Sequence, residues 1–244
     1  MTAMANAGRM LVALLLAALL VSCASPAQPI GGKSVPSQGD RDSVVHFGKL
    51  DIDRLADMQM RENTQSLRLL MTKLYKRNPR ELRKSTSGTV DEMVGWVFEG
   101  GHHWRFSKIN EAQGVAAIHL ALQPEYQGDR VLPFIVGIHT MLVKAHGGKS
   151  EFFLTDSIDP QSVYNVARNV EIAAWKLSNA RDAAGRPLLL SNEISAGERN
   201  LSFEREFGKI VGRLDLFSMV LAERSQRFIA RTAQNLATAL FLPF

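Results

Sequence analysis

Histidine is the residue type whose uneven distribution along the chain could support chemistry. Two carboxylates of the same region, Glu99 and Glu125, lie near most of the histidines in the sequence. Imidazoles and carboxylates that converge in a fold can hold a divalent metal or act as an acid–base pair. The spacings match no standard ligand set, so we predict no metal site and keep a catalytic or binding site as a hypothesis. Its candidates are the histidines between residues 102 and 146: His102, His103, His119, His139 and His146.

The loop around the first two histidines offers a second kind of chemistry, recognition. Residues 100–106 read GGHHWRF, so Trp104 and an arginine follow a glycine pair. Trp and Arg are frequent anchors of interfaces, which makes Trp104 a candidate contact for a sugar or a protein partner. The alternative is that Trp104 and Phe106 pack into the core. His119 and His139 lie on predicted apolar helix faces, where a single histidine commonly bonds a backbone carbonyl.

Signatures of other enzyme classes are absent from the sequence. It has no Gly-x-Ser-x-Gly elbow, no Ser-x-x-Lys pair, no His-Glu-x-x-His zinc motif, no phosphate-binding loop and no dinucleotide fingerprint. Glu151, Asp156 and Asp159 are close in sequence, and paired carboxylates can cleave glycosides when they flank a cleft. Asp159 is better explained as a helix N-cap and Asp156 as a turn cap, so we predict neither a glycosidase nor a cofactor.

The first 23 residues have the pattern of a secretory signal peptide followed by a lipid-attachment site. Arg9 precedes the apolar run MLVALLLAALLV at residues 10–21. A run of about 12 residues is too short to span a bilayer, which takes about 20, and is typical of a secretory signal. Its end, Leu20-Val21-Ser22-Cys23, resembles the lipobox of bacterial lipoproteins. The alternative is ordinary signal peptidase cleavage after Ala24 or Ala27.

The resemblance implies a diacylglycerol thioether on Cys23, with palmitate-like chains, cleavage before Cys23 and acylation of the new amino group. Residue 24 is Ala rather than Asp, which implies sorting to the outer membrane of a Gram-negative cell, facing the periplasm. Two or more acyl chains hold a protein stably, at about 0.8 kcal/mol per buried CH₂. Cys23 is the only cysteine, so no disulfide is expected. The mature region resembles Gram-negative lipoproteins in general rather than one named family.

The chain has 244 residues, of which 45% are hydrophobic and 22% charged, a globular mixture that excludes collagen-like and wholly disordered classes. We predict a signal peptide at 1–22, the lipidated Cys23 with a flexible tether at 23–45, and one helical domain at 46–244. Loss of Arg9 with the signal lowers the formal charge from +5 to +4. This mild basicity favours contact with anionic lipid or wall polymer. The basic residues 73–84 are interpreted as a solvated helix end, and no nucleic acid is expected.

Helical periodicity and start signals predict an all-α fold, a single globular domain of about five to seven helices. Residues 63–76 carry one apolar stripe, and residues 131–143, apolar on nearly every face, are the expected central helix. Residues 152–154 and 188–190 are short apolar runs, interpreted as strands or as loops that fill the core. Capping patterns mark the expected helix starts: Asn78-Pro79, Thr89-x-x-Glu92, Asn110-x-x-Gln113, Asp129, Asp159-Pro160 and Ser195-x-x-Glu198.

These features favour an adaptor or structural lipoprotein that docks onto an envelope assembly and has a protein partner there. One alternative is a lipid- or small-molecule-binding lipoprotein in which residues 131–143 line a cavity. The other is an enzyme of unrecognised type that uses the histidine-rich residues 102–146. The carboxy-terminal helical region is a candidate to pair with a partner helix, and the alternative is that it packs against its own domain. Gly208 and Gly212, four residues apart, either allow close helix contact there or are simply tolerated.

Overall fold

The computed structural model describes residues 38–148, 158–194, 199–226 and 240–244. The predicted signal peptide and Cys23, which belong to residues 1–37, lie outside the described residues. The run 152–154 and the predicted cap at Ser195 lie outside them as well. The chain divides into two units, Met1–Gly48 and Lys49–Phe244. In the first unit the described residues are helical from Gln38 onward, so the last residues of the predicted tether are helical.

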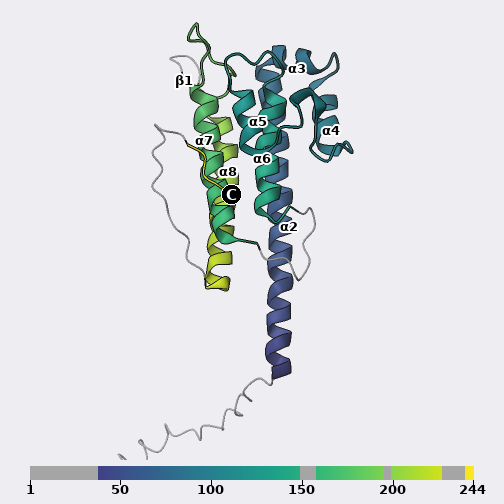
Figure 1. Cartoon of the computed structure of the whole chain (residues 1–244), viewed down its shortest axis with the longest axis vertical. Coiled ribbons are helices and arrows are strands. Elements are labelled where there is room, and N and C mark those ends of the chain that lie inside the picture. Colours follow the sequence, from purple (N-terminus) through teal and green to yellow (C-terminus); the bar gives the residue numbers. More distant parts are fainter. Residues whose placement is uncertain (1–37, 149–157, 195–198, 227–239) are drawn as a thin grey trace, which may run out of the picture. The chain divides into compact units, whose positions relative to one another are not determined.

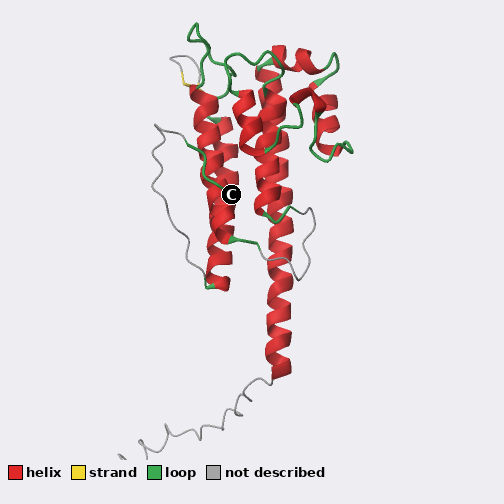
Figure 2. Ribbon diagram, in the orientation of Figure 1, coloured by secondary structure: helices red, strands yellow, loops and turns green. Residues whose placement is uncertain are grey.

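The all-α prediction is confirmed (Figures 1 and 2). Two strands of two residues each, β1 (Glu193–Ile194) and β2 (Arg199–Asn200), form a small antiparallel pair. The described residues contain seven α-helices and one 3₁₀ turn: α2 (Gln38–Arg77), α3 (Pro79–Ser85), α4 (Val90–Glu99), η1 (Ser107–Ile109), α5 (Gly114–Ala121), α6 (Val131–Ala145), α7 (Pro160–Asn179) and α8 (Ser202–Ser225).

Helix α6 is the central element of the second unit, as its uniformly apolar sequence predicts. It packs against α5 and α7, and α7 packs along α8 (Figure 1). Most of its residues are buried, including Phe134, Ile135 and Ile138. Thr140 and Val143 are only partly buried and Lys144 is exposed, so one side of the carboxy-terminal half of α6 reaches the surface.

Several helix starts follow from their caps. Thr89 and Glu92 form the predicted capping box, and the Asp159 carboxylate accepts a hydrogen bond from the Ser162 N–H. The Asp129 carboxylate accepts from the N–H groups of Val131 and Leu132, at 2.9 and 3.4 Å. These side chains satisfy backbone donors that a helix leaves without partners in its first turn.

Two predicted caps are wrong in detail. Asn110 lies in the left-handed region after η1, and α5 begins at Gly114, so the pattern 110–113 opens no helix. Asn78 precedes α3, but its side chain makes no cap. It donates instead to the carbonyl of Leu74 and exchanges hydrogen bonds with the backbone of Leu190. Leu190 therefore lies in a loop clamped to the end of α2, because the asparagine side chain completes that loop's backbone bonding.

Gly137 sets the close approach of α6 to α5. A Cβ at this position would lie 2.5 Å from Ile118 Cγ1 and 2.6 Å from the Gly114 carbonyl oxygen. We expect Gly137→Ala to lower the free energy of unfolding by about 2 kcal/mol, because the two helices must separate. Gly208→Ala is the matched control: its Cβ meets nothing within 4 Å, so alanine should stabilise α8 by about 0.5–1 kcal/mol. Urea unfolding measures both, and equal effects would contradict this packing.

Among the described residues, none of the helices combines the length and the apolarity that crossing a bilayer requires. The apolar run at residues 10–21 lies outside this part of the chain.

Candidate functional site

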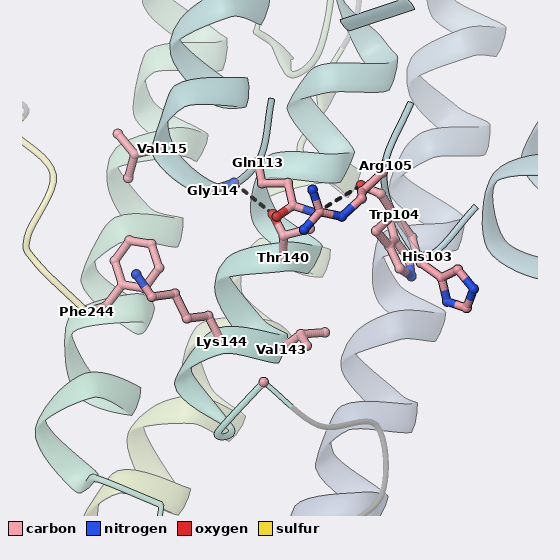
Figure 3. Close-up of a pocket in the computed structure, with 11 residues that line it drawn as sticks. His103, Trp104, Arg105, Gln113, Gly114, Val115, Thr140, Val143, Lys144 and Phe244 are labelled. Carbon is pink, nitrogen blue, oxygen red and sulfur yellow. Dashed lines mark hydrogen bonds between the residues drawn. The ribbon is translucent and has the colours of Figure 1, made fainter. Parts of the chain in front are cut away.

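A surface pocket of about 570 Å³ gathers residues of the aromatic loop, α5, α6 and the segment 240–244. We call it the Trp104 pocket. Phe244 and Lys144 lie on one side of it, His103, Trp104 and Arg105 on the other, and Gln113 and Thr140 between them (Figure 3). Its full lining is His103, Trp104, Arg105, Gln113, Gly114, Val115, Thr140, Val143, Lys144, Gly148 and Phe244.

The loop that carries Trp104 is held in an uncommon backbone conformation. His103 and Trp104 have φ angles of 48° and 58°, and Asn110 and Glu111 have 52° and 53°. The left-handed region is unfavourable for side chains other than glycine, and such residues cluster at functional sites. Hydrogen bonds within the loop hold this geometry, including the one from Gln113 Nε2 to the Trp104 carbonyl at 3.2 Å (Figure 3).

Trp104 covers the buried His139 of α6. The two rings stack with centroids 3.5 Å apart and planes inclined by 13°, and the Phe98 ring lies edge-on to the indole at 5.2 Å. His139 is buried and its Nδ1 has no hydrogen-bond partner among the described residues. Burial lowers the pKa of His139 to about 3, so its ring is neutral at physiological pH.

The floor of the pocket is fixed by Thr140. The Gly114 N–H donates to Thr140 Oγ1 at 2.7 Å (Figure 3). The Thr140 hydroxyl donates in turn to the Val136 carbonyl at 2.7 Å. Gly114 itself has a φ of 56°, which glycine adopts without strain. This chain of hydrogen bonds joins the start of α5 to α6 and leaves the pocket a polar floor between aromatic walls.

Two cations lie at the pocket. The Lys144 ammonium lies 4.8 Å from the centre of the Phe244 ring, a cation–π contact. Arg105 is exposed and forms a surface ion pair with Glu111 at 3.3 Å. The pocket therefore combines aromatic surface with positive charge, which suits a ligand that has an apolar group and an acidic or carbonyl group.

The structure disperses the histidines that the sequence places close together. His102 packs on Trp96 and Phe106, outside the pocket, and its buried Nε2 has no partner among the described residues. His103 lines the pocket but is exposed. Within the described ranges, no group of three or more His, Cys, Asp or Glu side chains is arranged to hold a metal ion.

The expected environment is wrong for His119 and right only in its burial for His139. His119 is exposed rather than in the core, with its ring edge-on to Phe241 at 5.3 Å. Partial desolvation of the ring beside Phe241, and secondarily the charge of Lys176, lower its pKa. His139 is buried as predicted, but it stacks on Trp104 instead of bonding a carbonyl. The carbonyl contact belongs to His146, whose Nδ1 lies 2.8 Å from the Leu142 oxygen and whose Nε2 lies 2.7 Å from Gln59 Oε1.

The two carboxylates considered with the histidines do not join them. Glu99 pairs with Arg68 of α2 at 2.6 Å, and Glu125 is exposed in the loop after α5. Trp104 meets both of its predicted descriptions, since it is partly buried against Phe98 and His139 and also lines the pocket. Sequence reasoning missed Thr140, Lys144 and Phe244, which are far from the loop in sequence.

We expect Trp104→Ala to raise the pKa of His139 from about 3 toward its ordinary 6.5, by at least about one pH unit, because water then reaches one face of the ring. The chemical shift of the His139 ring protons against pH, followed by NMR, measures this. Trp96→Ala, which removes another partly exposed indole, is the matched control and should leave the His139 pKa unchanged. An unaltered His139 pKa in Trp104→Ala would contradict the role of the indole as its cover.

Comparison of the chain with protein-family models, with curated proteins and with solved structures finds no match.

Proposed function

We propose that the chain is a lipoprotein, anchored through Cys23 in the outer membrane and facing the periplasm. Its helical domain acts as an adaptor that holds a segment of another envelope protein at the Trp104 pocket. The observation that carries the proposal is the composition of this pocket. Aromatic rings, two cations and a polar floor line it, and a strained loop holds its wall in place. That is a surface for recognition.

The geometry gives an enzyme less support. A general acid or base needs a titratable group within reach of substrate and a pKa near the working pH. His139 is neutral and covered by Trp104, while His119 lies beyond Phe241. The described lining of the pocket contains no carboxylate side chain that could pair with His103.

A small apolar anion is a second candidate ligand. The volume of about 570 Å³ falls in the range of about 300–1,000 Å³ that is usual for small-molecule sites. The pocket touches α6 at Thr140, Val143 and Lys144, on the partly exposed side of this helix. A ligand retained by the purified chain, and lost in Trp104→Ala, would favour this function.

The proposal is tested in Gram-negative cells that express the full chain. Metabolic labelling with an alkyne fatty acid should mark the natural chain and not Cys23→Ser. In-cell crosslinking should give a discrete complex that Trp104→Ala reduces at least fivefold. Trp96→Ala is the matched control, because Trp96 is an exposed indole outside the pocket, and it should leave the complex at its natural level.

Labelling of Cys23→Ser would contradict the anchor. A complex that survives Trp104→Ala unchanged, or that falls equally in Trp96→Ala, would contradict docking at the Trp104 pocket.

A further inference from the structure

We propose that residues 240–244 occupy, within the same chain, a peptide-binding groove formed by α5, α6 and α7. An extended partner segment with aromatic residues three positions apart takes the same place. This inference rests on the proposed adaptor function and names the chemistry of its partner.

Helix α7 binds the backbone of this segment through two asparagine side chains. The side chain of Asn169 accepts from the Leu242 N–H at 2.6 Å and donates to the Leu242 carbonyl at 2.8 Å. One turn earlier on α7, Asn165 Nδ2 donates to the Pro243 carbonyl at 2.7 Å. On the segment both amides contact only backbone groups, and such contacts bind a chain whatever its side chains are. Asn165 is itself held by Gln161, whose Nε2 donates to Asn165 Oδ1 at 2.8 Å.

The environment of Asn169 suits the binding of a backbone. This residue is fully buried, among the apolar residues of α7 such as Val166, Val170 and Ala173. A buried amide is costly unless its donor and acceptor are both satisfied, and here a single residue of the segment satisfies both. Asn169 makes both of these hydrogen bonds to Leu242, so its amide serves the bound segment rather than the contacts of α7 with other helices.

Two aromatic residues, Phe241 and Phe244, anchor the segment to the helices. The Phe241 ring lies edge-on to His119 of α5 at 5.3 Å and 5.6 Å from the Lys176 ammonium of α7. The Phe244 ring lies 4.8 Å from the Lys144 ammonium of α6, and close to Gly114 of α5. Leu240 is 74% exposed, and Pro243 is exposed as well. The groove thus recognises aromatic residues at positions i and i+3.

The segment leaves part of the pocket beyond Phe244 unfilled. The Trp104 pocket continues past this ring toward Trp104, Arg105 and Gln113 (Figure 3). Residues 240–244 line this pocket only through Phe244, so a longer partner segment gains contacts with Trp104 and Arg105 that the internal segment does not make. Phe241 and Phe244 are only partly buried, which makes the internal segment a ligand that a partner can displace.

The test uses the soluble mature chain, residues 24–244, and a fluorescein-labelled peptide with the sequence of residues 239–244, ALFLPF. The internal segment competes with the peptide, so the natural chain should bind it weakly. Phe241→Ala/Phe244→Ala, which removes the internal anchors from the full chain, should bind it at least tenfold more tightly by fluorescence anisotropy. A peptide with both phenylalanines replaced by alanine should not bind.

Asn169→Leu in the double-variant background should abolish peptide binding. Asn179→Leu on the same helix is the matched control and should leave binding intact, because Asn179 is exposed and bonds only the Trp175 carbonyl. Circular dichroism verifies that each variant is folded. If the double variant is not folded, Phe244→Ala alone is titrated and the same tenfold gain is expected.

A folded double variant that does not bind the peptide would overturn the groove and leave residues 240–244 as a structural strap only. That result is separate from the proposed function, which fails if the in-cell complex does not depend on Trp104. Peptide binding without a Trp104-dependent complex would uphold the groove and contradict the adaptor.

Discussion

Replacing Arg130 by methionine is expected to lower the free energy of unfolding by about 3 kcal/mol or more. Arg130 is buried at the start of α6, and its guanidinium closes the loop that joins α5 to α6. It donates to four backbone carbonyls, of Ala121, Gln123, Pro124 and Tyr126, at distances of 2.8, 2.6, 3.1 and 2.7 Å. A hydrogen bond to a charged group contributes about 1.5–3 kcal/mol, and the buried Ala121 carbonyl, left without a donor, adds a penalty.

The environment of Arg130 explains why the loss should be large. Its backbone N–H donates to the carboxylate of the buried Glu81, at 2.8 Å, and Lys84 donates to the same carboxylate. Beside it, the Asp129 carboxylate accepts from the Tyr75 hydroxyl at 2.6 Å and from the Ser85 hydroxyl at 2.7 Å. Residues 129 and 130 therefore join α2 and α3 to α6, and a shift of the loop disturbs all these contacts together.

Urea unfolding followed by circular dichroism at pH 7.5 measures the effect. Arg181→Met is the matched control, since this exposed arginine also donates to carbonyls, those of Ser178 and Ala180. At this exposed site water replaces the lost guanidinium as the donor to these carbonyls. We therefore expect the free energy of unfolding to change by at most about 0.5 kcal/mol. A loss below about 1 kcal/mol for Arg130→Met would contradict the account of the α5–α6 junction.

The second large effect is a loss of stability at acidic pH. Burial lowers the pKa of His139 to about 3 and that of His146 to about 4, the latter against the opposing effect of the Leu142 carbonyl. Both values lie below the ordinary 6.5, so the unfolded chain takes up these protons first as the pH falls. The stabilisation is present above pH 6.5. As the pH falls from 6.5 it is lost down to about pH 4 for His146 and about pH 3 for His139, at about 1.4 kcal/mol per pH unit for each histidine.

Carboxylates act in the same range, and Asp129 acts in the opposite direction. Burial raises its pKa, so its contribution is present at low pH and decreases as the pH rises above its ordinary 3.8. A comparison of the natural chain with a histidine variant therefore separates the contribution of that histidine from those of the carboxylates. The free energy of unfolding, measured by urea at several pH values from 7.5 to 4.5, should fall less steeply in His139→Phe by about 1.4 kcal/mol per pH unit. Parallel curves for the two proteins would contradict the assignment of this slope to His139.

The sequence predicted the fold class because its signals are local. The caps at Thr89 and Asp159 depend on residues within one turn, and the burial of residues 131–143 follows from their uniform apolarity. The pattern at 110–113 misled because asparagine, a common helix cap, also favours the left-handed conformation of a turn. Asn110 and Glu111 adopt such a turn, and α5 starts four residues after Asn110.

The site was only half predicted, since its parts meet through long-range packing. Trp104 and Arg105 stand out in the sequence, but nothing local places them opposite Lys144 and Phe244. Histidines that are close in sequence separate because α5 and α6 turn their side chains to different surroundings. Asn169 did leave a signal: it is a polar residue within the apolar stripe of α7, and a buried amide at such a position needs hydrogen-bond partners, which Leu242 supplies.

In the proposed function, the groove of α5, α6 and α7 holds a segment of another envelope protein. Site-specific photocrosslinking in cells tests it most directly, with benzoylphenylalanine placed at Val115 in the pocket lining or at the exposed Arg83 of α3 as the control. We predict one protein partner from Val115, none from Arg83, and a crosslinked peptide with aromatic residues three positions apart. Identical products from both positions, or products from Val115 that contain lipid and no protein, would contradict the claim.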